Sequence, residues 1–290
     1  MTAIGFIGLG AMGAAIAGRL LGLKGNEVYG TNRTKSKAQP LIERGLHWRD
    51  TPREVAARAD VVISMVTDDA ALAAVSDGPD GIVAGLLPVQ LYIDMSTVSP
   101  RVSTDLAARV SAAGAVMVDA PVSGSVPAAR DGSLAILVGG TAQGFEAASP
   151  LLSKLGNVSH VGDNGHGLLL KLAVNISLAA QMLAFSEGVL LAERGGIDRE
   201  VAAKVMAQTS IGSPMLKARA PLVLNLPEQA WFDVALMHKD IRLARDAARQ
   251  EGVQLPSAAI ADTVLSDAER AGYAHRDIAG LYEVLAKASR

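Results

Sequence analysis

The amino-acid sequence predicts an α/β protein with a doubly wound, mostly parallel sheet, followed by an all-helical part. Three observations predict it. In the first half of the 290 residues, short apolar runs alternate with helical patterns, as in units that build a parallel sheet. The first of these runs leads directly into a glycine-rich turn. After residue 163 the strand pattern stops. We therefore expect two domains, 1–163 and 164–290, joined by a long helix.

Composition and charge exclude several classes of protein. Apolar residues make up 50% and charged residues 19% of the chain, an ordinary globular composition. The net charge of −2 and the lack of a basic run argue against a nucleic-acid partner. The chain has no cysteine, which removes disulfides, thiolate zinc sites and cysteine nucleophiles, and fits the reducing cytoplasm, where we expect the protein.

Two apolar segments resemble targeting or membrane signals. The N-terminal segment has its first charge at Arg19, so the basic region that opens a signal peptide is missing. Residues 168–192 are long enough to span a bilayer. They carry four side chains that are expensive at membrane depth, namely Lys171, Asn175, Gln181 and Glu187. We therefore expect a buried core helix and no membrane partner.

The first predicted strand, residues 3–7, is followed by a glycine turn and a helix over 14–20. The turn has the pattern G-x-G-x-x-G and consists of Gly8, Leu9, Gly10, Ala11, Met12 and Gly13. Backbone N–H groups at such a helix N-terminus receive a dinucleotide pyrophosphate. Gly8 would allow the tight turn, Gly10 the close approach of the phosphates, and Gly13 the packing of helix on strand. The motif alone is weak evidence, but its strand–helix context supports cofactor binding.

The second predicted strand, residues 27–30, bears on which cofactor binds. An NAD site usually presents Asp or Glu near this point to hold the ribose 2′-hydroxyl. Here the strand is followed by Asn32, Arg33 and Thr34. A planar cation with small donors suits a 2′-phosphate. We expect NADP(H) ahead of NAD(H); the alternative is a solvated basic turn.

Two further apolar runs, 61–66 and 91–95, are typical of strands buried on both faces of a parallel sheet. Ligands of such sheets bind beyond the carboxyl ends of the strands. The candidate cofactor contacts there are Met65, Val66, Thr67 and Thr97. For any one of them, an ordinary loop residue is an equally good interpretation.

A Ser-Gly-Ser turn, made by Ser123, Gly124 and Ser125, follows the next predicted strand and precedes another. Such a turn can present backbone N–H groups and hydroxyls to an anion, typically a carboxylate. A turn without a ligand is the alternative. We therefore name it as a candidate substrate site.

The second half of the chain is predicted to be helical, over 165–194, 199–208, 236–250, 257–271 and 278–288. Prolines at 214, 221, 227 and 256 punctuate the predicted connections. In the long first helix, Lys171 and Asn175 are four residues apart and share one face. A lysine and an amide inside an apolar helix are costly unless something compensates them. This anomaly indicates a site.

Other catalytic motifs are absent from the sequence. It has no P-loop and no G-x-S-x-G, and no tyrosine is followed four residues later by lysine. The five histidines are scattered, so we expect no metal. A hydride transfer would then need an organic acid to polarise the carbonyl, and Lys171 is the best-placed candidate. A lysine that reaches solvent is the alternative, and His166 is the second candidate acid.

Four stretches, in this order, resemble the β-hydroxyacid dehydrogenase family, which includes 3-hydroxyisobutyrate dehydrogenase and the tartronate, glyoxylate and succinic semialdehyde reductases. They are the cofactor motif at 5–13, the substrate motif at 119–124 with Gly132 and 139–140, the catalytic motif at 165–175, and a second cofactor motif at 239–244. The resemblance covers nearly the whole chain. It implies a Rossmann domain and a helical domain, assembled as a homodimer or homotetramer.

The resemblance also implies roles for matching residues. Lys171 would be the catalytic acid/base, and Asn175 would orient the substrate. Ser123 and Gly124 would bind a substrate carboxylate, and Thr97 and Lys239 would contact the cofactor. The sequence from 32 to 34 looks like that of NADP-using members. Two departures, Ser125 in place of a second glycine and His166 in place of a small residue, bear on the substrate rather than on the reaction type.

The expected function is thus an NADP(H)-dependent oxidoreductase that interconverts a small β-hydroxyacid and its semialdehyde by hydride transfer, with Lys171 as general acid/base. One alternative is an imine reductase on the same fold, although such relatives usually carry Asp or Tyr at the position of Lys171. The other alternative is a non-catalytic NADP-binding protein.

Overall fold

The structure, a computed structural model that describes residues 2–289, divides into two compact units, Met1–Lys171 and Leu172–Arg290. The division falls inside helix α9 (His166–Arg194). It lies later than the predicted boundary because the first turns of α9 pack with the first unit, where Leu168 joins an apolar core. The domain limits 1–163 and 164–290 stay a prediction.

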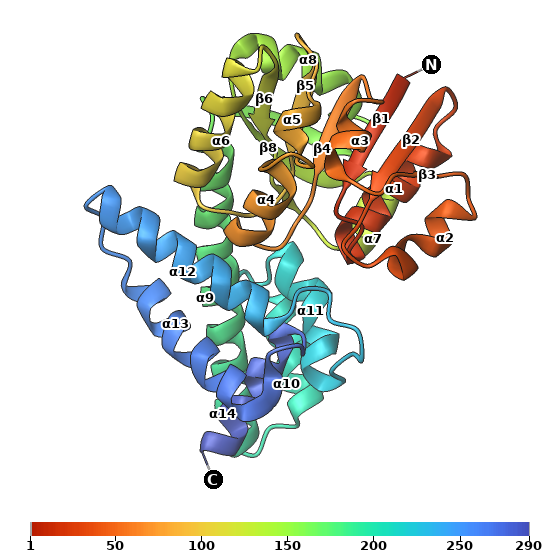
Figure 1. The fold of residues 1–290 in the computed structure, drawn as a ribbon. Helices are drawn as coiled ribbons and strands as arrows, with labels where there is room; N and C mark the ends of the chain where they lie inside the picture. The colour runs from red at the N-terminus through yellow and green to blue at the C-terminus, as the bar shows by residue number, and fades with distance from the viewer. Residues whose placement is uncertain (1, 290) are drawn as a thin grey trace. The chain divides into compact units, whose positions relative to one another are not determined.

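The first unit is organised around one sheet, which has nine strands within the described residues (Figure 1). The strands are β1 (Thr2–Ile7), β2 (Asn26–Thr31), β3 (His47–Trp48), β4 (Val61–Ser64), β5 (Leu91–Asp94), β6 (Val116–Asp119), β7 (Val122–Ser123), β8 (Leu134–Gly139) and β9 (Gly156–Gly162). Their order is β3-β2-β1-β4-β5-β6-β8-β7, with β9 paired to β8. From β3 to β6 neighbouring strands are parallel, whereas β8 is antiparallel to β6 and β7.

Helices cover both faces of this sheet. They are α1 (Ala11–Gly22), α2 (Gln39–Ile42), α3 (Pro52–Ala56), α4 (Asp69–Ser76), α5 (Ile82–Gly85), α6 (Pro100–Ala112), α7 (Val126–Asp131), α8 (Ala142–Leu152) and the 3-10 turn η1 (Lys35–Ala38). Because side chains alternate along a strand, Ile4 and Phe6 of β1 join one core with Ile16 of α1, and Ile7 joins the other with Leu106 of α6. This confirms the predicted doubly wound, mostly parallel sheet.

The second unit consists of helices in the part of the chain that the structure describes. After α9 come α10 (Arg199–Gln208), α11 (Pro214–Leu224), α12 (Val234–Gln250), α13 (Pro256–Ala268), the π-helical turn η2 (Glu269–Tyr273), the 3-10 turn η3 (Ile278–Gly280) and α14 (Leu281–Ala288). Their apolar faces share a core that includes Phe185 of α9, Met237 and Ile241 of α12, and Leu265 of α13. The predicted all-helical second part is confirmed.

The sequence prediction missed several elements. Strands β3 and β7 have two residues each, too few for a periodic signal, and no residue of β9 is buried. The prediction that Pro214, Pro221 and Pro256 lie in connections was wrong, because the first two lie in helix α11 and Pro256 is the first residue of α13. Pro214 occupies the first turn, where no N–H is needed, and Ser213 caps that turn by accepting the N–H of Leu216.

Helix α9 is the one described helix that is long and apolar enough to cross a membrane by length and composition. Of its most apolar 18-residue window, 44% is buried inside the structure. Lys171 and Asn175 are among its buried residues. A helix that buries such polar groups within the protein has the character expected of a core helix.

Candidate active site

The glycine turn after β1 has the geometry that a dinucleotide cradle requires. Gly8 has φ +94°, and a Cβ there would lie 2.2 Å from the carbonyl oxygen of Met65. A Cβ on Gly13 would lie 2.0 Å from the carbonyl oxygen of Gly8. A Cβ on Gly10, by contrast, would meet no atom within 4 Å. The first and last glycines are therefore required by packing, and the middle one borders open space.

This open space lies at the N-terminus of α1. Gly10 is the N-cap residue and provides no side-chain cap. The first N–H groups of an α-helix have no partner within the helix, so they are available to an anion. Of the remaining turn residues, Leu9 is buried, Met12 is half-buried and Ala11 is exposed. The residues present thus fit the pyrophosphate of a dinucleotide cofactor.

Asn32, at the end of β2, ties two loops together. Its side-chain oxygen accepts the N–H of Leu9 at 3.0 Å, and its Nδ2 donates to the carbonyl oxygen of Thr34 at 2.9 Å. Arg33 and Thr34 themselves are exposed. Asn32 therefore fixes the turn beside the cradle, and the exposed Arg33 directly follows it.

A buried network joins the carboxyl ends of β4 and β5, and sequence reasoning missed it. Asp94 Oδ1 accepts hydrogen bonds from the hydroxyls of Ser64 and Ser96, both at 2.6 Å. Ser96 Oγ in turn accepts the N–H of Val66 at 2.9 Å. Burial, and then the charge of Asp94, raise the pKa of Tyr92 well above its usual range, which keeps its hydroxyl neutral beside Ser64.

This network holds the loops that contain the predicted cofactor contacts. Met65 and Val66 are half-buried, Thr67 is exposed, and Thr97 is half-buried directly after Ser96. All four lie beyond the carboxyl ends of adjacent parallel strands, as predicted. The signal that could have revealed Asp94 is an acidic residue at the end of a fully buried strand.

The Ser-Gly-Ser turn follows β7. Gly124 has φ +143°, and a Cβ there would lie 2.8 Å from the side chain of Leu134, so this position requires glycine. Ser123 and Ser125 are half-buried. Ser125 precedes α7 without forming a side-chain capping hydrogen bond. The turn is thus shaped by its glycine and has a half-buried serine on either side of it.

Asp119, at the end of β6, caps the N-terminus of α9, although the amides that it caps are 46 and 49 residues away in the sequence. Its Oδ1 accepts the N–H of Gly165 at 2.6 Å, and its Oδ2 accepts the N–H of Leu168 at 3.0 Å. Side chains at Gly139 and Gly167 would each come within 2.6 Å of this carboxylate. Burial raises the pKa of Asp119 to about 6, although the two amide hydrogen bonds act in the opposite direction.

Lys171 follows this capped turn in α9. Lys171 is buried, with 8% of its surface exposed, whereas His166, at the helix start, is exposed. The Nδ1 atom of His166 accepts the N–H of Asp163 at 3.1 Å, so that ring nitrogen is occupied. The burial of Lys171 and the exposure of His166 favour Lys171 over His166 as the candidate acid.

In the second unit, Asp240 of α12 brings two predicted residues together. Asn175, which is fully buried, donates from Nδ2 to Asp240 Oδ2 at 2.6 Å. The Nζ of Lys239 lies 2.9 Å from Asp240 Oδ1. Sequence reasoning missed Asp240 as a site residue. The available signal was an acidic residue on the buried face of an amphipathic helix, next to Met237 and Ile241.

Residues 2–289 provide no cluster of metal ligands. No group of three or more histidine, aspartate or glutamate side chains in that range is arranged to hold a metal ion. The candidate groups of the first unit are the glycine turn with Asn32, the loops after β4 and β5, and the capped start of α9. In the second unit the candidate group is the Asn175–Asp240–Lys239 cluster.

Comparison with known proteins assigns both halves of the chain. Residues 3–162 match the NAD binding domain of 6-phosphogluconate dehydrogenase. Residues 165–285 match the NAD-binding domain of NADP-dependent 3-hydroxyisobutyrate dehydrogenase. Glyoxylate/succinic semialdehyde reductase 2 of Arabidopsis thaliana, a chloroplastic protein, is 33% identical over 98% of this chain and 79% of its own length.

Solved structures agree with these matches. The 3-hydroxyisobutyrate dehydrogenase of Mycobacterium tuberculosis, solved with L-serine, is 29% identical, with a TM-score of 0.85 over 98% of this chain and 99% of that one. An imine reductase variant from Myxococcus stipitatus, in complex with NAD+, is 21% identical, with a TM-score of 0.66 over 98% and 99% of the two chains. At that identity the imine reductase shares the fold, and no activity follows from it.

Proposed function

Since the chain belongs to the β-hydroxyacid dehydrogenase family, we propose that it is an NADP(H)-dependent oxidoreductase that interconverts a small β-hydroxyacid and its semialdehyde. The family establishes a nicotinamide-dependent oxidoreductase; the reaction, the cofactor preference and the residue roles are the proposal. The observation that carries it is a buried lysine, Lys171, in a helix whose first turn is capped by Asp119, within the same unit as the glycine cradle.

The proposed roles follow from the chemistry of each group. When bound, the reduced nicotinamide supplies a hydride to the carbonyl carbon. Lys171 gives a proton to the carbonyl oxygen, so that the alcohol forms without a buried alkoxide. Ser123 and Gly124 bind the substrate carboxylate through hydroxyl and backbone N–H groups. We assign Asn175 to orienting the substrate, and Thr97 and Lys239 to contacting the cofactor, as the family resemblance implies.

The replacement of Lys171 by alanine tests the reaction. Lys171→Ala should lower kcat by at least about 100-fold, the usual contribution of a positioned general acid, and leave the Kd for NADPH within about twofold. The exposed His166→Ala serves as the matched control and should retain most of the activity. A near-normal kcat in Lys171→Ala would refute the assignment of the acid.

NADP(H) preference rests on Arg33, which is exposed beside Asn32 and Thr34 where an acidic residue would serve NAD(H). Arg33→Gln should raise the KM for NADPH about tenfold or more and change the KM for NADH little. Arg58→Gln removes a similarly exposed cation of the same unit and should change neither. A wild-type preference for NADH by an order of magnitude would refute the proposal.

The substrate class is tested by the oxidation of NADPH with glyoxylate and with succinic, tartronate and methylmalonate semialdehydes, repeated with NADH. The imine reductase alternative predicts reduction of a cyclic imine instead; the presence of Lys171 argues against it. The non-catalytic alternative predicts tight NADPH binding without turnover of any of these compounds. Turnover of one semialdehyde, lost in Lys171→Ala, would exclude both alternatives.

We also assign the protein to the cytoplasm, because a chain without cysteine suits a reducing compartment. A homodimer or homotetramer is proposed from the family resemblance. It is supported by apolar side chains of the second unit that are half or more exposed, at Leu191, Ile197, Val201 and Val205. Light scattering should give an oligomer for the wild type and a smaller species for Val201→Glu/Val205→Glu. A monomeric wild type would refute this assembly.

A further inference from the structure

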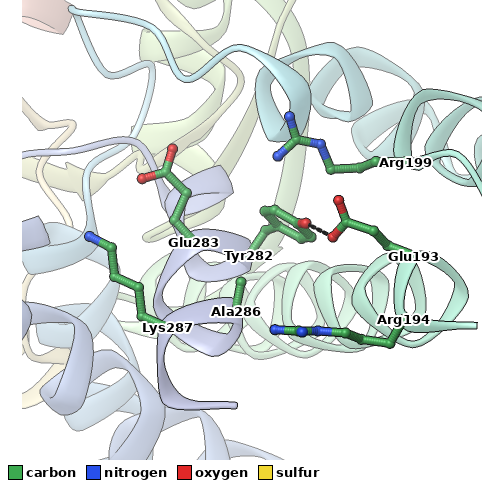
Figure 2. Close-up of a pocket in the computed structure, with 7 residues that line it drawn as sticks. All are labelled: Glu193, Arg194, Arg199, Tyr282, Glu283, Ala286 and Lys287. Carbon is green, nitrogen blue, oxygen red and sulfur yellow. Dashed lines mark hydrogen bonds between the residues drawn. The ribbon is translucent and has the colours of Figure 1, made fainter. Parts of the chain in front are cut away.

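A pocket of about 540 Å³ lies within the second unit and contains none of the proposed catalytic or cofactor residues (Figure 2). The end of α9, the start of α10 and helix α14 form it. It is lined by Glu193, Arg194, Arg199, Tyr282, Glu283, Ala286 and Lys287. Five of these seven side chains are charged.

Each of the two carboxylates of the pocket accepts a hydrogen bond from a tyrosine hydroxyl. The hydroxyl of Tyr282 donates to Glu193, and the hydroxyl of Tyr273 donates to Glu283 at 2.6 Å. Burial raises the pKa of Tyr282, which keeps its hydroxyl protonated for this role. The tyrosines therefore hold Glu193 and Glu283 in place as hydrogen-bond acceptors.

The three cations of the pocket form no ion pair with these two carboxylates. Among residues 2–289, no carboxylate lies within ion-pair distance of Arg194, Arg199 or Lys287. Arg199 instead stacks over Tyr282, with its guanidinium carbon 5.1 Å from the ring centroid. Lys287 donates to the hydroxyl of Tyr273 at 2.8 Å. The three cations exceed the two carboxylates of the pocket by one, so the pocket attracts an anion.

The cations stand at two ends of the pocket with an apolar wall between them. Figure 2 shows Arg199, Glu193 and Arg194 on one side, with Glu193 between the two arginines; Lys287 lies on the other side, and Tyr282 with Ala286 lies in the middle. Tyr282 is 3% exposed and is held by its bond to Glu193, so this wall is preorganised. Arginine binds carboxylates through paired N–H donors, and lysine binds them as a point charge.

We propose that this pocket binds a short dicarboxylate with an apolar middle. One carboxylate would pair with Arg194, the other with Lys287, and the methylene groups would lie along Tyr282 and Ala286. The inference does not rest on the proposed reaction, since no residue is shared between the two sites.

The probes are succinate and glutarate, titrated calorimetrically into the full-length protein saturated with NADP+. We expect saturable binding of at least one of them, weakened about tenfold or more in Arg194→Gln, because that variant loses a charge-assisted pair. Lys204→Gln, which removes an exposed cation of α10 outside the pocket, should bind within twofold of the wild type. Circular dichroism should show that both variants are folded.

Further measurements distinguish binding in this pocket from binding at other anion sites. Ser123→Ala alters the proposed substrate site and should leave the binding measured here unchanged; loss of binding in that variant would overturn the proposal. Acetate, with one charge, should bind at least tenfold more weakly than the dicarboxylate. Equal binding of inorganic phosphate would overturn the dicarboxylate assignment, and unchanged binding in Arg194→Gln, or no saturable binding of either probe, would overturn the site.

Discussion

The Oδ1 atom of Asp119 lies 2.6 Å from the amide nitrogen of Gly165. Asp119 ends strand β6, and Gly165 directly precedes helix α9, so this hydrogen bond joins the sheet to the helix that contains Lys171. The second oxygen of the carboxylate accepts the N–H of Leu168 at 3.0 Å. A negative charge here satisfies two helix N-terminal amides and interacts favourably with the helix dipole. We infer that Asp119 positions the turn from which Lys171 acts.

The replacement Asp119→Asn tests this positioning role. An asparagine can accept one of the two N–H groups, but its own NH2 group would face the other. We expect the free energy of unfolding at pH 7.5 to fall by about 1–3 kcal/mol. We also expect kcat to fall about tenfold or more, because Lys171 loses its fixed position. Asp80→Asn, at an exposed loop position, should change neither quantity. An Asp119→Asn variant with wild-type stability and kcat would contradict the inference.

The raised pKa of Asp119, about 6 against an ordinary 3.8, also makes stability depend on pH. A raised carboxyl pKa means that the folded chain binds the proton more readily than the unfolded chain does. The resulting stabilisation of the folded state is fully present below about pH 4 and is lost as the pH rises through 6. It amounts to about 3 kcal/mol at most. The stability advantage of the wild type over Asp119→Asn should therefore be larger at pH 4.5 than at pH 7.5. Urea denaturation of both proteins measures it, and an advantage that shrinks on acidification would show the opposite sign.

Two glycines of the cofactor turn should respond differently to alanine. A Cβ at Gly13 would lie 2.0 Å from the carbonyl oxygen of Gly8, so Gly13→Ala should destabilise the fold by about 1–3 kcal/mol. A Cβ at Gly10 would meet nothing within 4 Å, so Gly10→Ala should change stability by less than about 0.5 kcal/mol. Gly10→Ala should nevertheless raise the Kd for NADPH about tenfold or more. Unimpaired NADPH binding in Gly10→Ala would mean that the phosphates do not approach there.

Asp240 should stabilise the second unit through Asn175 and support activity through its charge beside Lys239. Asp240→Ala leaves the buried Asn175 amide without the acceptor that lies 2.6 Å away, which should cost about 1–3 kcal/mol of unfolding free energy. Asp240→Asn keeps an acceptor for Asn175 but removes the charge beside Lys239. We therefore expect Asp240→Asn to restore most of the stability, measured by denaturant titration, and little of kcat/KM. If both variants matched the wild type in both measurements, the cluster would have no role.

The buried pair Arg219–Asp277 is a purely structural contact of the second unit. Its side chains are 8% and 0% exposed, and Asp277 also accepts the N–H groups of Trp231 and Phe232. Asp277→Ala leaves a buried guanidinium unpaired and should cost about 3–5 kcal/mol of unfolding free energy. The exposed pair Arg101–Asp105 is the control, and Asp105→Ala should cost less than about 1 kcal/mol. Similar losses in the two variants would contradict this assignment.

Features set by local chemistry could be predicted from the sequence alone. The glycine turn from Gly8 to Gly13, with a strand before it and a helix after it, has the conformation and the packing that its spacing predicted. The alternating strands and helices indicated a parallel sheet, and the apolar pattern of α9 indicated a buried helix. These features depend on backbone conformation and on side-chain periodicity over a few residues, and both can be recognised in a linear sequence.

The tertiary structure decided which residues hold these features in place. Asp119 and Gly165 are 46 residues apart, and Asn175 and Asp240 are 65 residues apart, so no local pattern predicted either pair. The same holds for Asp94, which accepts a hydrogen bond from Ser64 on a neighbouring strand. A buried carboxylate is tolerated only where donors converge on it, and that convergence exists only once distant segments have packed together.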